Sequence, residues 1–244
     1  HEEDPAFISE NGINAGAVAK ELGITGSPAL AEDSLVARDC MIALHTGASV
    51  NIQHISSGHS VRMVELAKQL GAHVMAEVTP HHFSLDETAV LKHGTLAKMN
   101  PPLRTFEDKQ EILRGLKEGV IDIIATDHAP HSEEDKLKGM AGMVGSETAF
   151  GVCYTKLCKE EGLPLELLSH LMSTRPAEIL GLAKGQLEPG YDADFVLVDL
   201  DTPYTVDKNK LHSKSHNCPF DGAQLYGRVC ATVKGGELTY QAEE

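Results

Sequence analysis

Short apolar runs alternate with helical patterns over the first two thirds of the chain. Residues 49–55, 73–78 and 120–125 are brief, nearly continuous apolar runs, which predict buried strands. Apolar positions three and four apart predict helices over 28–44, 60–70, 106–117 and 145–159. Ser60 is expected to cap the second of these helices, and Gly71 to end it. Short apolar strands separated by helices indicate parallel βαβ units.

The pattern changes after residue 183. The string GQLEPGYDADFVLVDLD combines turn residues with an alternating β run, and GRVCATVKGGELTY predicts a hairpin around Gly235-Gly236. The sequence therefore predicts an α/β domain over residues 1–183, followed by a β-rich region over 184–244.

Composition and charge exclude some classes of protein. The formal net charge of −15 disfavours nucleic acid as a partner, because phosphate binding needs a basic surface. The longest apolar runs are too short to span a bilayer. The five cysteines show no CxxC pattern, so we expect reduced thiols in a cytoplasmic protein that does not associate with membranes.

Polar residues follow the predicted strands. His54 comes directly after the first apolar run, Asp127 follows the third, and the chain opens with His1. In an α/β barrel, the C-terminal strand ends share one mouth, where active sites form. Imidazole and carboxylate groups at that mouth suit zinc. A lone histidine at a strand end is more often structural, so the hypothesis depends on the combination.

Several strings make the hypothesis more specific. HEED, QHIS, TPHHF, KMNPPLR and ATDHAPH occur in this order and together resemble the motifs of the cyclic amidohydrolases. KMNPPLR together with DHAPH resembles the dihydroorotase branch in particular. GQLEPGYDADFVLVD and NCPFDG resemble the small β-sandwich domain of that family.

The resemblance implies a fold. Residues 1–183 would form the C-terminal half of a (β/α)8 metal-dependent hydrolase barrel, strands five to eight, with a strand ending at His1. Residues 184–244 would form part of the small β-sandwich domain. The family's HxH pair and its bridging lysine or aspartate are not found here. We therefore expect them upstream of His1, and we expect these 244 residues alone to lack a complete active site.

The resemblance also implies roles for individual residues. His1 and His54 would hold one zinc ion, while Asp127 would bind a second zinc ion and act as the catalytic general base. Asn100 and His131 would contact the substrate, and the main chain of Gly142 would line the substrate pocket.

The implied activity is the reversible hydrolysis of dihydroorotate, a small-molecule substrate, to N-carbamoyl-aspartate. A homodimer is expected. One alternative is a sister enzyme acting on hydantoin, dihydropyrimidine or allantoin, although a neutral substrate gives His131 little purpose. The other is an inactive homologue that scaffolds aspartate transcarbamoylase, against which the presence of His1, His54 and Asp127 argues.

The remaining polar residues near the predicted mouth have structural interpretations. Arg104 could meet a substrate carboxylate, but we expect it to brace its own loop. We expect His81 and His82 either to support the site residues from behind or to be structural. Residues 132–144 are rich in charge and contain Gly139 and Gly142, which predicts a mobile lid.

Overall fold

The computed structural model describes residues 1–242, which form two compact units. The first unit contains His1–Gly145 and Leu211–Pro219, and the second contains Ser146–Lys210 and the described residues from Phe220 onward. The predicted boundary after residue 183 falls inside the second unit. The assignment of 1–183 to a barrel and 184–244 to a β-sandwich stays a prediction.

The first unit is built on a parallel sheet. Its strands are β1 (Val50–Ile52), β2 (Val74–Val78) and β3 (Ile123–Ile124), in the order β1-β2-β3. Each strand pairs in parallel with its neighbour, and Val50 lies opposite Val74. The three predicted parallel strands are therefore confirmed, although each is shorter than its apolar run. His1 precedes any strand of the described chain, so the strand predicted to end there stays a prediction.

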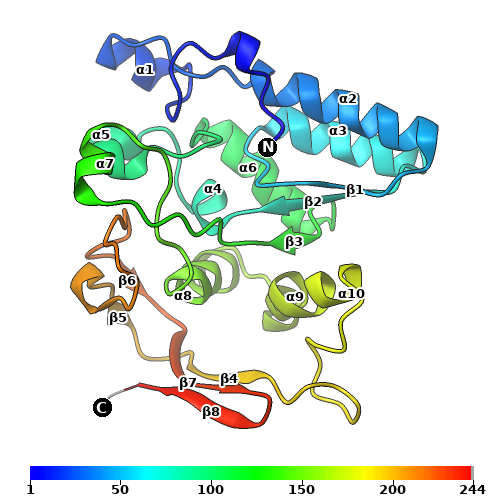
Figure 1. The fold of residues 1–244 in the computed structure, drawn as a ribbon, viewed down its shortest axis with the longest axis vertical. Coiled ribbons are helices and arrows are strands. Elements are labelled where there is room, and N and C mark those ends of the chain that lie inside the picture. The colour runs from blue at the N-terminus through cyan, green and yellow to red at the C-terminus, as the bar shows by residue number, and fades with distance from the viewer. Residues whose placement is uncertain (243–244) are drawn as a thin grey trace. The chain divides into compact units, whose positions relative to one another are not determined.

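Helices cover this sheet. In Figure 1, α2 and α3 lie side by side next to β1 and β2, and α3 also contacts α6. Apolar side chains such as Ile52, Val64 and Leu116 are fully buried between the helices and the strands. The helices of the unit are α1 (Ala17–Leu22), α2 (Leu30–Thr46), α3 (Gly58–Gln69), α4 (Pro80–Ser84), α5 (Ala89–His93), α6 (Phe106–Lys117) and α7 (Glu133–Leu137), with 3-10 turns η1 (Pro5–Phe7) and η2 (Gly94–Ala97).

Helices α3, α4, α6 and α7 begin with a side-chain cap, but the cap predicted for α3 is wrong. Helix α3 begins at Gly58, and the side chain of Ser57 accepts a hydrogen bond from the amide of His59 at 3.2 Å. Ser60 lies inside the helix, where its hydroxyl donates to Asp33 at 2.8 Å. Ser57 takes the cap because its backbone is extended, which the N-cap position requires.

The second unit combines short helices with antiparallel strands. The hairpin predicted around Gly235-Gly236 is confirmed, and both glycines have positive φ. The strands are β4 (Phe195–Asp199), β7 (Arg228–Lys234) and β8 (Glu237–Gln241) in the order β4-β7-β8, with β5 (Tyr204–Thr205) paired to β6 (Gln224–Leu225). The helices are α8 (Ala149–Cys153), α9 (Leu165–Ser169) and α10 (Arg175–Ile179), with π-helical turns η3 (Tyr154–Glu160) and η4 (His170–Thr174) and the 3-10 turn η5 (Lys208–Lys210). Across the described residues, every helix is too short or too polar to cross a membrane.

Candidate active site at the strand ends

Two of the predicted site residues have unusual backbone conformations. His54 follows β1 with φ of 35°, and Asp127 follows β3 with φ of 47°. Among the described residues, these are the two non-glycine positions with positive φ. A side chain in this region costs on the order of 1–3 kcal/mol, and such strain concentrates at functional sites. The backbone thus marks the two positions that the sequence motifs had indicated.

The structure brings His1 and His54 together. Their imidazole centroids lie 4.3 Å apart, with the rings tilted by 56°. His1 is exposed, whereas His54 is buried. Burial, reinforced by the nearby His82, lowers the pKa of His54 to about 4. The His54 imidazole is therefore neutral near pH 7, which is the form that binds a metal ion.

Asp127 lies at the surface beyond the end of β3. Partial removal of water from around its carboxyl group raises its pKa. A carboxylate with a raised pKa is a stronger base, which suits proton transfer near neutral pH.

The donors present fit part of a zinc site. Two neighbouring imidazoles, one of them held neutral by burial, are the nitrogen ligands that zinc takes. Within residues 1–242, however, no three His, Cys, Asp or Glu side chains lie close enough together to hold a metal ion. His1, His54 and Asp127 therefore do not form a complete three-ligand group by themselves.

A cavity of about 330 Å³ connects His1 with Asn100. Its lining residues are His1, Glu3, Pro5, Ile8, Asn11 and Asn100. The side-chain oxygen of Asn100 is buried, and within the described part of the chain it has no hydrogen-bond partner. A buried polar atom without a partner is costly, so it suits a ligand that supplies a donor.

His131 and Gly142 are in close contact. Gly142 has φ of 118°, and a Cβ atom there would lie 2.8 Å from the Cβ of Ala129 and 3.1 Å from Nε2 of His131. Only glycine fits at such a position. The predicted substrate-binding pair is thus adjacent, although the structure gives no direct contact between this pair and the His1–His54 pair.

The segment between His131 and Gly142 differs from the loose loop that its composition predicts. Residues Glu133–Leu137 form α7, whose N-cap Ser132 accepts a hydrogen bond from the amide of Asp135 at 3.1 Å. Lys136 is only 2% exposed. Its ammonium group donates to the carbonyl oxygens of Met140 at 2.6 Å and Gly142 at 2.8 Å. This packing counts against the predicted mobile lid, because a buried lysine secures the segment.

We expect the stability of the protein to show the titration of Lys136. Burial lowers the pKa of this lysine to about 8. Since the folded pKa lies below the unfolded value, the unfolded state binds more protons between the two, and this contribution to stability rises from about pH 8 to about pH 10.5. Urea unfolding of the parent protein and of Lys136→Met over this range measures the effect. The rise should be smaller in the variant, and equal slopes would contradict the prediction.

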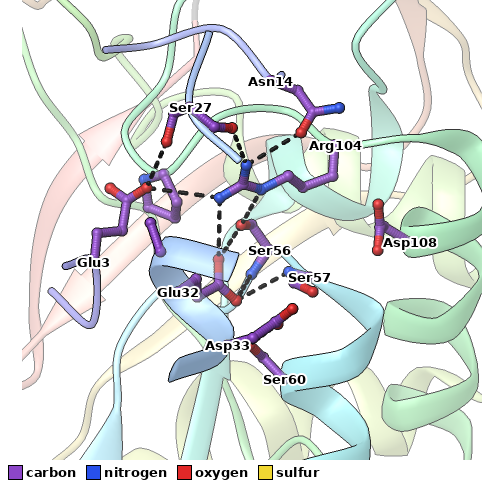
Figure 2. Close-up of polar contacts among 12 residues, drawn as sticks. Glu3, Asn14, Ser27, Glu32, Asp33, Ser56, Ser57, Ser60, Arg104 and Asp108 are labelled. Atoms are coloured by element: carbon purple, nitrogen blue, oxygen red, sulfur yellow. Dashed lines mark hydrogen bonds and ion pairs between the residues drawn. The ribbon is translucent and has the colours of Figure 1, made fainter. Parts of the chain in front are cut away.

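Arg104 is the centre of a buried polar network, shown in Figure 2. Its Nε donates to the Ser56 hydroxyl at 3.1 Å, and its Nη1 donates to the Ser27 carbonyl at 2.7 Å and to Asn14 Oδ1 at 3.1 Å. Its Nη2 lies 3.6 Å from Glu3 and 3.7 Å from Glu32. Arg104 is thus structural, but not in the predicted way, because its side chain bonds to segments distant in the chain and, among the described residues, not to its own loop.

The same network supports the two histidines through their neighbours. Glu32, on α2, accepts hydrogen bonds from the amides of Ser56 and Ser57 at 3.0 Å each, and from the Ser56 hydroxyl. Ser56 follows His54 by two residues, and Glu3 follows His1 by two residues. The network therefore joins both segments that carry the predicted nitrogen ligands. Sequence analysis missed Glu32, because an acidic residue in the first turn of a helix is ordinary.

The other histidines of this region have structural partners. Buried His82 contacts the Thr79 hydroxyl at 2.7 Å through Nδ1 and the Pro101 carbonyl at 2.9 Å through Nε2. His128 accepts a hydrogen bond from the amide of Gly145 at 3.0 Å. These contacts are consistent with the supporting or structural role predicted for His82, which stays a prediction. His81 is buried beside it, with ring centroids 4.6 Å apart.

Comparison with known proteins places the chain in a family. Residues 14–239 match the amidohydrolase family. The chain is 50% identical over 246 residues to a dihydroorotase of Clostridioides difficile (strain 630), covering 99% of this chain and 58% of that protein. It is 44% identical over 247 residues to a dihydroorotase of Lactococcus lactis subsp. lactis, covering 100% and 58% respectively.

Solved structures give the same picture of the fold. An L-hydantoinase (dihydropyrimidinase) from Arthrobacter aurescens superposes with a TM-score of 0.85 at 28% identity, covering 89% of this chain and 50% of that one. A D-hydantoinase from a Thermus species gives a TM-score of 0.84 at 26% identity, covering 93% and 52%.

The chain belongs to the amidohydrolase family, whose members have a barrel fold of the TIM type. It spans about 58% of the length of the curated relatives that it matches.

Proposed function

We propose that the protein is a dihydroorotase, which interconverts dihydroorotate and N-carbamoyl-aspartate. The observation that carries the proposal is the 50% identity to a curated dihydroorotase over nearly the whole chain. The adjacent pair of His131 and Gly142 supports it, because a cationic or hydrogen-bonding group beside a tight main-chain turn suits a substrate carboxylate. We propose a homodimer that acts without nucleic acid.

We propose that zinc is the metal of this site. His1 and His54 would hold one ion, and Asp127 would contribute to a second, together with ligands from outside this chain segment. Bound zinc would supply hydroxide at neutral pH and polarise the amide carbonyl. Coordination needs the neutral form of His54, which its low pKa provides.

The chain's own residues would carry the proton transfer. Asp127 would accept the proton of the attacking water and deliver it to the ring nitrogen that leaves when the amide bond breaks. The positive φ at Asp127 directs the carboxyl group away from the regular course of the strand.

Three further residues would hold the substrate. Asn100 lines the cavity beside His1. Its side-chain oxygen is buried and has no hydrogen-bond partner among residues 1–242. This oxygen would accept a hydrogen bond from a ring N–H of the substrate. His131 and the main chain of Gly142 would orient the carboxylate. Fixing the carboxylate places the amide carbonyl for attack, which is the positional part of catalysis.

A hydantoinase activity is the second candidate, because the solved structures that superpose on this chain are hydantoinases. Their identities of 28% and 26% are well below the 50% identity to a dihydroorotase. The substrate distinguishes the two candidates, since hydantoin and dihydrouracil have no carboxylate for His131 to bind.

We expect His131→Ala to lower kcat/KM for dihydroorotate by about 10- to 100-fold, because a hydrogen bond to a charged group is lost. The full-length protein should be assayed on dihydroorotate, hydantoin, dihydrouracil and allantoin, before and after the substitution. Exposed His73, at the start of β2, provides the matched control His73→Ala. If the parent protein preferred a neutral ring as substrate, the proposal would be wrong and the protein would be a sister enzyme of dihydroorotase.

A further inference from the structure

The segment Leu211–Pro219 packs with the first unit, although the chain on both sides of it belongs to the second. It ends in the first three residues of the NCPFDG string, to which the proposed function gives no role, and the last three residues of the string belong to the second unit. Asn217, the first residue of that string, is only 4% exposed. Its hydrogen-bond partners lie in the first unit, which also carries the predicted substrate residues.

Asn217 joins two separate stretches of the substrate-binding segment. Its side-chain oxygen accepts a hydrogen bond from the amide of His131 at 3.2 Å. Its side-chain nitrogen donates to the carbonyl of Ala129 at 2.9 Å and to that of Gly142 at 3.2 Å. Its own carbonyl accepts from the amide of Val144 at 3.1 Å. The side-chain amide of Asn217 therefore has two acceptors for its N–H groups, one at Ala129 and one at Gly142.

These contacts set the position of one predicted substrate residue relative to the other. The backbone of His131 is held from one side, and the carbonyl of Gly142 from the other. Lys136 donates to the same Gly142 carbonyl at 2.8 Å, and the amide of Gly142 donates to Lys98 at 2.8 Å. Gly142 is thus fixed at its amide and its carbonyl. Asn217 connects it to His131, beside the backbone hydrogen bond from the amide of Ala129 to the carbonyl of Met143 at 2.8 Å.

We infer that Asn217 is a positioning residue that aligns His131 and Gly142 as one binding element for a carboxylate on a cyclic amide. The inference rests on the proposed function and deepens it. Asn217 acts through His131 and Gly142, and its effect is on recognition of the carboxylate. Its chemistry requires an amide, because the group has to donate twice and accept once at the same place.

Asn217→Asp keeps the acceptor for His131 and removes both donors. We expect it to raise KM for dihydroorotate by about tenfold and to change kcat by much less. Any slow turnover of dihydrouracil should be unaffected, since that ring has no carboxylate. Asn217→Ala should raise KM further, because it also removes the acceptor. Asn209→Asp is the matched control, an exposed asparagine whose amide donates within its own turn.

Hydrogen–deuterium exchange of the substrate-free, full-length protein tests the positioning separately from catalysis. Both Asn217 variants should exchange faster at the amides of residues 129–144, while β1 and β2 stay as protected as in the parent. Unchanged exchange there together with an unchanged KM would overturn the inference, as would faster exchange across the whole unit. If the parent protein does not hydrolyse dihydroorotate, the proposed function fails, and the exchange pattern still decides whether Asn217 holds the segment.

Discussion

Replacing Asp127 with asparagine is expected to lower kcat for dihydroorotate by about 10²- to 10⁴-fold, the usual contribution of a general base. Asparagine is the substitution of choice because it has nearly the same shape and tolerates positive φ, which is 47° at this position. The backbone should therefore stay as it is, and the loss should be chemical. Initial rates in both directions of the reaction measure it.

A matched control is available at the other end of the same strand. Asp122 directly precedes β3, on the N-terminal side of the strand, and forms an ion pair with Lys68 at 2.6 Å. Asp122→Asn should lower stability and leave kcat within about twofold of the parent. If Asp127→Asn kept more than a tenth of the parent's kcat, the general base would have to be another group.

Elements with strong local signals were predictable from the sequence. Helix α6 has the predicted bounds because Thr105 and Asp108 form a capping box around an apolar face. The hairpin of β7 and β8 follows from its two glycines. By contrast, β3 was predicted as a longer strand, although only Ile123–Ile124 pairs with β2. An apolar run shows that residues are buried, but it does not show how many of them find a partner strand.

The site was predictable only in part, for a related reason. His54 and Asp127 stand in recognisable strings at strand ends, and the structure gives both an unusual backbone conformation. Lys136 was read as part of a charged loop, yet it is buried because three carbonyl groups converge on it. Glu32 had no signal either. The NCPFDG string marked Asn217 as part of a family motif but did not reveal its partners. The partners lie 24 residues from Glu32 and 86 residues from Asn217 in the chain. Long-range hydrogen bonds leave no periodic trace in a sequence.

Arg104→Ala is expected to lower the free energy of unfolding of the first unit by about 3–5 kcal/mol, the usual loss when a buried ion pair loses one partner. The substitution removes the positive charge beside buried Glu3 and Glu32 and the donors to Asn14 and Ser27. Urea unfolding, followed by far-UV circular dichroism, gives the change in free energy. Arg62→Ala is the control, because this exposed arginine pairs with Glu111 at the surface and should contribute about 1 kcal/mol or less.

Arg104→Lys separates charge from geometry. Lysine would restore the positive charge, but a single ammonium group cannot reach Ser56, Asn14 and Ser27 in the planar arrangement that the guanidinium group provides. We therefore expect only partial recovery of stability. The double variant Arg104→Met with Glu32→Gln should be more stable than Arg104→Ala, because it removes the negative charge of Glu32 together with the positive charge of Arg104. A loss of 1 kcal/mol or less in Arg104→Ala would mean that the buried Glu3 and Glu32 do not depend on this arginine. The link between the His1 and His54 segments would then rest on the hydrogen bonds that the amides of Ser56 and Ser57 donate to Glu32.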